Sequence, residues 1–369
     1  MFNRERNAKM KWYDGFLKKL DTPLWVRLVL LYYMGISPGF AGNDLLLTHV
    51  FINPVDSLEK ITITESQSEN GLSNWFSQDV NRAVCTSEQC KMVNIRLFWD
   101  GVGNYQRFEL IDNEPLTKTD HTSFDSEDYA KLNGILADAN SIFRELGMED
   151  LVVETDETID GKTGATQKSL SEYVVSEAVY TCYTLWHIVY GPTQSRIKAL
   201  IAERASEAYL RLALTNEDSI YPIWALGYVA DHPGNSVPFF DRLLTQLTSS
   251  NETVASLAME AIHPQALSKE GSQLAFVNQI PQLDDLKKLD MLWKLAEAET
   301  VYDQVLIQLL GYYQAGQLNA TALGYVYKLF SAPNMANPIV YKNLERLLSD
   351  PNRYVANTTK KLLEKWTVD

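Results

Sequence analysis

The sequence predicts an α+β N-terminal domain followed by an all-α C-terminal domain. Short β-rich runs separated by turns continue to about residue 158, whereas every later apolar segment has helical spacing. The chain has 369 residues, enough for about two domains at roughly 150 residues each. We therefore expect one domain over residues 42–192 and a second over residues 193–369.

The composition is that of a globular protein. Hydrophobic residues make up 46%, aromatic residues 11% and charged residues 22%, which argues against a disordered, collagen-like or polytopic membrane chain. Lys and Arg number 33 against 47 for Asp and Glu, so the net charge is −14. Such an acidic chain repels phosphate backbones, and we do not expect nucleic acid to be a partner.

Residues 1–41 have the character of a targeting segment. They hold seven basic and three acidic side chains, a local charge of +4 that leaves −18 for the rest. An apolar run over residues 28–36 is followed by Ser-Pro-Gly and small residues up to Ala41, as in a signal peptide. An amphipathic N-terminal helix is the alternative. We expect an exported, periplasmic or other extracytoplasmic protein, free after cleavage or anchored by an uncleaved N-terminus.

Runs rich in β-branched and aromatic residues predict strands at residues 45–51, 61–64 and 93–99. The third alternates, with Val, Ile, Leu and Trp on one side, so it should be half-buried. Gly-Val-Gly-Asn at 101–104 then turns the chain into residues 105–110, which predicts a hairpin.

Two helices and a strand should complete this domain. Ser126-Glu127-Asp128 opens a helix that continues to Leu136, and a shorter one should run from Ile142 to Gly147. Leu-Val-Val at 151–153 predicts the last strand.

After Ser169 the sequence predicts one long apolar helix that ends before Gly191-Pro192. Its buried line would consist of Leu170, Val174, Ala178, Thr181, Leu185 and Ile188. Further helices are expected at residues 197–214, 221–229, 237–247, 254–262, 286–295, 301–313, 320–330, 338–348 and 353–366.

Two of these segments resemble each other and the start of the second helix in a HEAT-type repeat. They are residues 251–258 and 350–357. The resemblance implies helix pairs stacked into an irregular solenoid, in which each pair packs only on its neighbours. A single non-repetitive helical bundle is the alternative.

The run Asp-Gly-Lys-Thr-Gly-Ala-Thr at residues 160–166 carries the clearest chemistry. Its glycines allow close backbone approach, and Thr166 stands just ahead of the expected long helix, whose free N–H groups would seat a phosphate. An ordinary turn is the alternative, because Ser169-Leu170-Ser171-Glu172 also fits a capping box.

This run resembles the signature Asp-Gly-x-Ser/Thr-Gly-Ala-Thr of FMN-binding domains in which the flavin is attached through a phosphoester. Such domains occur in flavin-carrying subunits of sodium-pumping NADH:quinone reductases and in related exported electron-transfer proteins. The resemblance implies that Thr166 bears the FMN phosphate. It also implies a loop recognised by an FMN transferase and formed by Asp160, Gly161, Thr163, Gly164 and Ala165.

The match covers seven residues, and a weaker domain resemblance extends over about residues 90–190. Residues 178–187 also resemble bacterial FMN-binding-like proteins with helical C-termini. The glycine-rich strands typical of the family are missing upstream, so the residues around the isoalloxazine ring are not assigned.

The resemblance implies an exported electron-transfer flavoprotein rather than a single-substrate enzyme, with FMN as its cofactor. Its partners would be an FMN transferase for maturation and a redox protein or membrane reductase. The alternative is a non-catalytic helical-repeat scaffold whose FMN-binding-like domain is vestigial. No catalytic residue is assigned in either case.

The cysteines and histidines give weaker indications. Cys85 and Cys90 could close a small disulfide loop, act as a redox pair or be unrelated thiols, and Cys182 should be a small buried hydrophobe. The five histidines are scattered, so a zinc site is not expected. They are His49, His121, His187, His232 and His263.

Remaining polar and aromatic residues have plain structural interpretations. Asp120-His121 should lie in a loop; the alternative for the same residues is a polar cluster near a flavin. His187 should be a satisfied core histidine. Three aromatic residues at helical spacing should belong to the core or stack on a flavin, namely Tyr180, Tyr183 and Trp186. Asp284-Asp285 and residues 149–157 should be solvated surface.

Overall fold

The computed structural model describes residues 44–84, 91–119, 121–151, 170 and 173–366. Several predicted features fall on residues outside these ranges and stay predictions. They are the N-terminal segment 1–41, the pair Cys85 and Cys90, Asp120, the strand residues Val152 and Val153, and the whole motif 160–166.

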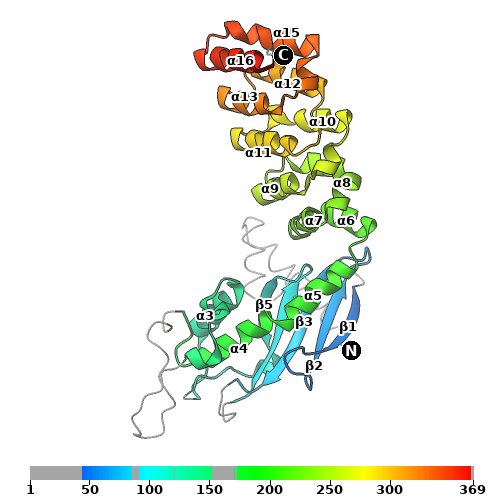
Figure 1. Cartoon of the computed structure of the whole chain (residues 1–369). Helices are drawn as coiled ribbons and strands as arrows, with labels where there is room; N and C mark the ends of the chain where they lie inside the picture. Colours follow the sequence, from blue (N-terminus) through cyan, green and yellow to red (C-terminus); the bar gives the residue numbers. More distant parts are fainter. Residues whose placement is uncertain (1–43, 85–90, 120, 152–169, 171–172, 367–369) are drawn as a thin grey trace, which may run out of the picture. The chain divides into compact units, whose positions relative to one another are not determined.

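The N-terminal domain is built on a five-stranded sheet in the order β1-β2-β3-β4-β5 (Figure 1). Neighbouring strands from β2 to β5 pair antiparallel. The strands are β1 (Leu45–Ile52), β2 (Lys60–Gln67), β3 (Ser73–Arg82), β4 (Val93–Asp100) and β5 (Tyr105–Leu110). Four of the five strands, including the β4–β5 hairpin, were predicted.

Strand β3, in the middle of the sheet, was not predicted. Its sequence Ser-Asn-Trp-Phe-Ser-Gln-Asp-Val-Asn-Arg holds few apolar residues, so no alternation is visible. In the sheet, Phe76, Gln78 and Val80 occupy one buried face. Gln78 is tolerated there because the Thr193 hydroxyl donates to its side-chain oxygen at 2.7 Å.

Helices pack on the buried face of the sheet (Figure 1). They are α3 (Ser126–Ala137), the 3-10 helices η2 (Ile142–Arg144) and η3 (Met148–Leu151), α4 (Val179–Val189) and α5 (Pro192–Glu203). Trp99 of β4 is fully buried beneath them, and its indole N–H donates to the Val189 carbonyl at 3.1 Å. The side chains of Trp186 and Tyr190 likewise donate to carbonyls at the end of α3. Burial and buried hydrogen bonds therefore fix α4 on the sheet together.

The prediction of one long helix from Ser169 is wrong in its first part. Helix α4 begins at Val179, and Glu177 just before it has a φ of 59°. Its N-cap, Ala178, makes no side-chain capping bond, so the expected capping box at Ser169 does not start this helix. Leu170 and Val174 are nevertheless buried, which is why the sequence suggested a continuous helical stripe.

Two observations next to the motif segment differ from the sequence-based expectations. The α4 N-terminus begins thirteen residues after Thr166, so it does not directly follow that threonine as expected. Leu151 also ends the 3-10 helix η3 instead of starting a strand. The N-terminus of α4 therefore offers no phosphate seat next to Thr166 in the sequence.

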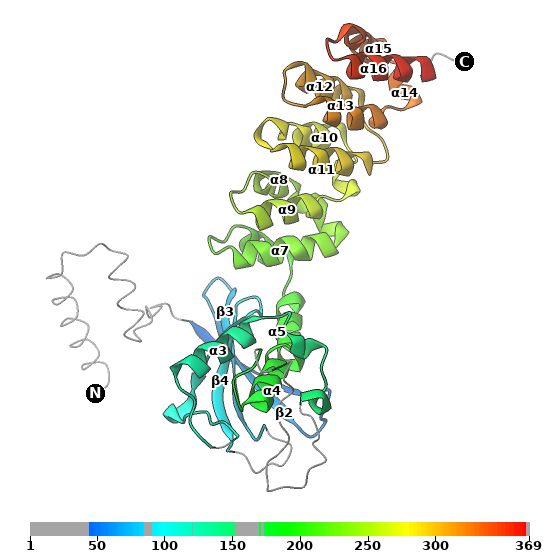
Figure 2. The same cartoon turned by 90° about the vertical axis from the view of Figure 1, so that its left-hand side faces the viewer.

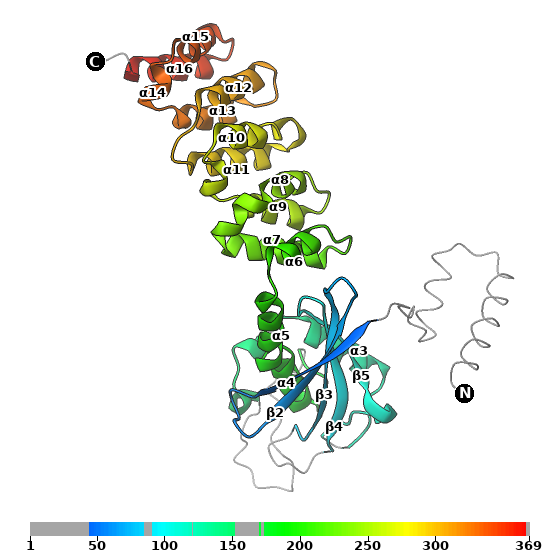
Figure 3. The same ribbon diagram turned by 90° about the vertical axis from the view of Figure 1, so that its right-hand side faces the viewer.

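An array of helices forms the rest of the described chain (Figures 2 and 3). It consists of α6 (Glu207–Leu214), α7 (Ile220–Asp231), α8 (Ser236–Gln246), α9 (Glu252–Ala261), α10 (Glu270–Val277), α11 (Asp285–Ala296), α12 (Asp303–Gln314), α13 (Ala320–Val326), α14 (Ala332–Met335), α15 (Pro338–Glu345) and α16 (Arg353–Trp366), with short 3-10 turns between them. The predicted α+β domain followed by an all-helical domain is confirmed. Helices α10 and α14 were not predicted.

The array has two layers of helices in contact. Helices α7 and α9 pack together, α11 packs on α13, and α13 packs on α16, while α10, α12 and α15 form the second layer. Buried polar side chains join successive turns. For example, Gln273 donates to the carbonyls of Leu267 and Thr300 and accepts from the Tyr302 backbone.

Helix α5 belongs to the core of the sheet domain. The sequence suggested a single helix over residues 197–214 within the second domain, but α5 ends at Glu203 and α6 starts at Glu207. Ile197 and Ile201 of α5 pack in the core of the sheet domain, whereas Leu210 of α6 packs in the core of the array. Ile201 is the last residue of α5 in the core of the sheet domain, while Leu72 and Val102 from the sheet segment pack in the core of the array.

Gly101 occupies a position that has no space for a side chain. A Cβ there would lie 1.9 Å from the Ser73 carbonyl oxygen and 2.6 Å from the Tyr221 hydroxyl. That hydroxyl donates to the same carbonyl at 2.7 Å. Glycine is therefore required for the strand end, the carbonyl and the tyrosine to meet.

We predict that Gly101→Ala lowers the free energy of unfolding by about 3 kcal/mol, the upper end of overpacking costs. Urea denaturation measures the change. Gly311→Ala in α12 is the matched control, because nothing lies within 4 Å of its added Cβ. Alanine should stabilise that helix by roughly 0.5–1 kcal/mol. A Gly101→Ala protein as stable as the wild type would contradict the packing described.

Candidate functional site

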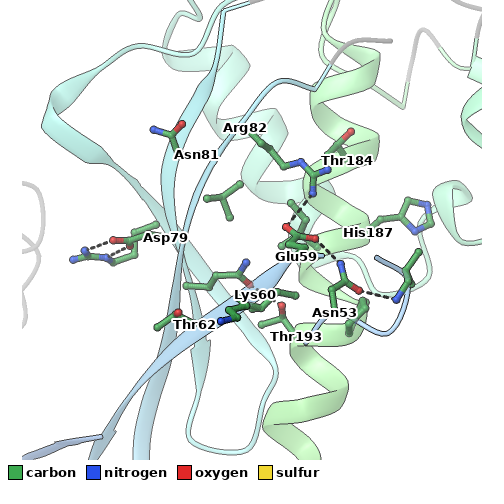
Figure 4. Close-up of a pocket in the computed structure, with 18 of the residues that line it drawn as sticks. Asn53, Glu59, Lys60, Thr62, Asp79, Asn81, Arg82, Thr184, His187 and Thr193 are labelled. Atoms are coloured by element: carbon green, nitrogen blue, oxygen red, sulfur yellow. Dashed lines mark hydrogen bonds and ion pairs between the residues drawn. The ribbon is translucent and has the colours of Figure 1, made fainter. Parts of the chain in front are cut away.

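A groove of about 810 Å³ lies between the sheet and α4 (Figure 4). We call it the sheet-domain groove. Its volume is within the range of roughly 300–1,000 Å³ typical of small-molecule sites. Its polar lining comes from the β1–β2 connection, from β2, β3 and β4, and from α4 and the start of α5. The polar side chains that line it include Asn53, Glu59, Lys60, Arg82, Tyr183, Thr184 and His187.

Helix α4 forms one wall of the groove. His187 follows Thr184 by three residues and Tyr183 by four, so each pair is adjacent on the helix surface, and all three residues line the groove. Within the described residues, the Thr184 hydroxyl oxygen and His187 Nε2 are buried atoms without a hydrogen-bond partner. An unsatisfied buried polar atom costs about 1–3 kcal/mol, so Thr184 and His187 keep unused hydrogen-bonding capacity in the helix that lines the groove.

His187 is held in its neutral form. Burial lowers the pKa of its imidazole below the ordinary 6.5, and a hydrogen bond with the Phe143 backbone offsets this only in part. Because that bond favours the protonated ring, the backbone group must be an acceptor, and the neutral ring keeps its proton on that side. Nε2 therefore offers a lone pair. The Tyr183 ring, whose centroid lies 4.2 Å from that of His187, supports the imidazole.

Charged groups on the opposite wall are mostly paired. Glu59 accepts from the Asn53 amide at 2.6 Å and lies 3.6 Å from Arg82 (Figure 4). Arg96 pairs with Asp79 through two hydrogen bonds. Of the three cations that line the described groove, Lys60 alone has no carboxylate within 4.0 Å. The groove can therefore accept a ligand with a polar or partly negative edge.

A second polar cluster has no free capacity. The fully buried Glu65 carboxylate accepts from the Ser73 hydroxyl at 2.6 Å, from His49 Nε2 at 2.7 Å and from both terminal nitrogens of Arg204. Burial raises the Glu65 pKa, but these donors outweigh it and hold the pKa below the ordinary 4.5. Each oxygen already has two donors, so we interpret this cluster as structural.

The predicted site residues lie outside the described residues, but their flanks do not. All six predicted cofactor residues, Asp160, Gly161, Thr163, Gly164, Ala165 and Thr166, are in the segment 152–169. Leu151 on one side is fully buried and Leu170 on the other is 2% exposed. Both pack in the core of the sheet domain with α4. The chain therefore enters and leaves the motif segment at the domain that holds the groove.

Two polar residues of α4 differ from what the sequence predicted. His187 was expected to be a satisfied core histidine, but its Nε2 is unpartnered, and Thr184 was given no role of its own within the run 178–187. The available signal was their i, i+3 spacing in an otherwise apolar helix. Trp186 is buried as expected, while Tyr183 lines the groove.

Other expectations agree with the structure. Cys182 is fully buried, and burial raises the pKa of its thiol to about 12, as suits a small core residue. His121 lies in an exposed loop closed by a bridge between Thr117 and Ser123. Asp284 caps the N-terminus of α11 and Asp285 follows it at the surface.

We predict that Glu65→Gln lowers the free energy of unfolding by roughly 3 kcal/mol at pH 7. Breaking a buried ion pair strands its partner, and the cost is moderated because the Arg204 side chain is 25% exposed. The folded-state pKa is depressed, so the stabilisation is complete above about pH 4.5 and is lost as the pH falls through the folded pKa.

Urea denaturation at neutral and acidic pH provides the measurement. Wild type and Glu65→Gln should converge at low pH. Glu203→Gln breaks an exposed pair with Arg196 and serves as the control, with an expected cost of less than about 1 kcal/mol. A pH-independent difference for Glu65→Gln would show that the ionised carboxylate does not matter.

Three further findings bear on function. In the described part of the chain, no group of three or more His, Cys, Asp or Glu residues is arranged to hold a metal ion. None of the described helices is both long and apolar enough to cross a membrane. Comparisons with protein-family models, with curated proteins and with solved structures found no match.

Proposed function

We propose that this chain is an exported flavoprotein that carries FMN covalently on Thr166 and acts in extracytoplasmic electron transfer. The seven-residue motif at 160–166 suggests the attachment. The observation that carries the proposal is the sheet-domain groove, with its two unpartnered polar atoms, in the same domain that anchors both ends of the motif segment.

The lining of the groove fits a flavin ring. The pyrimidine edge of isoalloxazine presents one N–H donor between two carbonyl acceptors. His187 Nε2 can accept a hydrogen bond, the Thr184 hydroxyl can donate or accept one, and Lys60 can donate to a carbonyl. In this proposal these side chains hold and orient the ring, while Tyr183 keeps the imidazole in place.

The cofactor would supply one- and two-electron chemistry, and the protein its binding and electrostatic environment. Covalent attachment suits an exported carrier, since free FMN would be lost outside the cell. An FMN transferase is then needed for maturation, and a redox protein or membrane reductase for turnover.

We further propose that the helical array is of the HEAT type. The two segments that resemble the start of a second HEAT helix are residues 251–258 and 350–357. They include the starts of α9 and α16, which both belong to the layer of α7, α9, α11, α13 and α16. Pairs that pack mainly on their neighbours are what a solenoid requires.

Attachment can be tested by co-expressing the chain with an FMN transferase in a bacterial periplasm. We expect the wild type to fluoresce on a denaturing gel and to gain the mass of one FMN less one water. Thr166→Val should show neither signal. Thr248→Val, at an exposed position in the array, is the control and should be labelled like the wild type.

If no version is labelled while a known substrate of the transferase is, the covalent flavin is refuted. The alternative of a helical-repeat interaction protein with a vestigial FMN-binding-like domain would then be favoured.

The role of the groove is tested on the labelled protein with His187→Phe and Thr184→Val. Both variants should keep the attached flavin but shift its absorbance maxima and its midpoint potential, because polar contacts to the ring are lost. In the wild type the spectrum should also change as the pH falls below 6.5, where His187 takes up a proton; His187→Phe should lack this change.

The exposed His232→Phe is the control and should leave the flavin spectrum and potential unchanged. Groove variants with a wild-type spectrum and potential would place the ring elsewhere, even if Thr166 is its point of attachment.

A further inference from the structure

The helical array has a groove of its own, unrelated to the motif and the sheet. It has a volume of about 460 Å³ and lies between α9 and α11. We call it the array groove. Its lining consists of Glu252, Ala255, Ser256, Met259 and Glu260 from α9, and Asp284, Leu286, Lys287, Asp290, Trp293, Lys294 and Glu297 from α11 and its ends.

Charges in the array groove are unbalanced. Five carboxylates face two lysines, a local charge of −3. Glu260 and Asp290 have no Lys, Arg or His nitrogen within 4.0 Å in the described chain. Unpaired carboxylates on neighbouring helices repel each other and favour a cationic occupant.

In the ion pairs of this groove, the carboxylate side chains are more exposed to solvent than the lysine side chains. Lys287 bridges Glu252 and Asp284, and Lys294 pairs with Glu297. Both lysine side chains are only 18% exposed, whereas the three carboxylates are 52–74% exposed. An approaching partner therefore meets carboxylates first, and the lysines do not cancel the acidic surface it contacts.

Two large apolar side chains stand in this acidic surface. Leu286 is 76% exposed and Trp293 is 60% exposed, although α11 already buries Met291, Leu292 and Leu295. Seven residues separate Leu286 from Trp293, which places them on one face of the helix two turns apart. The core of the array therefore does not need either of them.

Trp293 is partly held in place from the next helix of the same layer. Its ring centroid lies 6.0 Å from that of Tyr325 on α13. The Lys328 ammonium lies over the Tyr325 ring, 4.4 Å from the ring centroid. An exposed, supported tryptophan surrounded by charged residues is the usual composition of a binding hot spot.

We infer that the array groove docks a basic segment of a partner protein, one in which Lys or Arg residues flank an apolar side chain. The cations would meet Glu260, Asp290 and the outward carboxylates, and the apolar side chain would pack between Leu286 and Trp293. A second copy of this chain is a poor occupant, because each copy carries a net charge of −14. The inference does not depend on a flavin.

The test uses the full chain and a fluorescently labelled peptide of alternating lysine pairs and single leucines. A second peptide with glycine in place of each leucine has the same charge. At low ionic strength the leucine peptide should bind the wild type at least about fivefold more tightly than the glycine peptide. Fluorescence anisotropy provides the dissociation constants.

Two groove variants separate the contributions. Glu260→Gln combined with Asp290→Asn should weaken binding of the leucine peptide about tenfold, and Trp293→Ala should weaken it by a similar factor. The charge-matched control is Asp231→Asn combined with Glu345→Gln. Both are exposed carboxylates outside the groove, and this control should change the affinity by less than about twofold.

Each other outcome overturns the inference. Equal binding of the two peptides, or equal weakening by groove and control variants, would mean that the acidic chain attracts polycations without a site. A wild-type dimer in sedimentation that Trp293→Ala converts to monomer would make a second copy the occupant. All changed residues are exposed or half-exposed, and thermal unfolding of each variant verifies that it folds.

Discussion

One buried carboxylate holds the N-terminal domain together. Glu65 on β2 binds His49 of β1, Ser73 of β3 and, through two nitrogens, Arg204 at the C-terminal end of α5. The other end of α5 is fixed by the bond from Thr193 to Gln78. A buried charge is tolerated only when it is fully paired, so these bonds allow one position of α5 on the sheet.

The groove depends on that position. Helices α4 and α5 meet at Gly191, where a Cβ would lie 2.1 Å from the His187 carbonyl oxygen, so only glycine permits the tight turn. With α5 fixed at both ends and this turn between them, α4 is held with Thr184 and His187 in the wall of the groove. The Glu65–Arg204 ion pair thus helps to position the groove wall, although neither residue lines the groove.

Sequence patterns correctly predicted the strands and helices that are determined by residues close together in the chain. Strand β4 was found because its apolar and polar residues alternate, and most array helices were found from their spacing and caps. Strand β3 was missed because Gln78 replaces an apolar residue on its buried face, and the bond from Thr193 that satisfies it spans 115 residues. The end of α5 was missed because Arg204 is a good helix former whose partner, Glu65, lies 139 residues away in sequence.

The candidate site divides in the same way. The motif at 160–166 is a local signal, visible in seven consecutive residues. The spacing of Thr184 and His187 in an apolar helix was a local signal as well, but their lack of hydrogen-bond partners is a property of the folded environment. The overestimated helix from Ser169 has a related cause: Leu170 and Val174 are buried at helical spacing, yet residues 173–178 are not helical, since burial on a core does not require a helix.

In the proposed function, Thr166 carries the flavin. After expression with the transferase, trypsin should cut at Lys162 and Lys168 and release the peptide of residues 163–168, which contains two threonines. Tandem mass spectrometry of this peptide should locate one FMN, joined through its phosphate, on Thr166. An unmodified peptide, or flavin on Thr163, would contradict it.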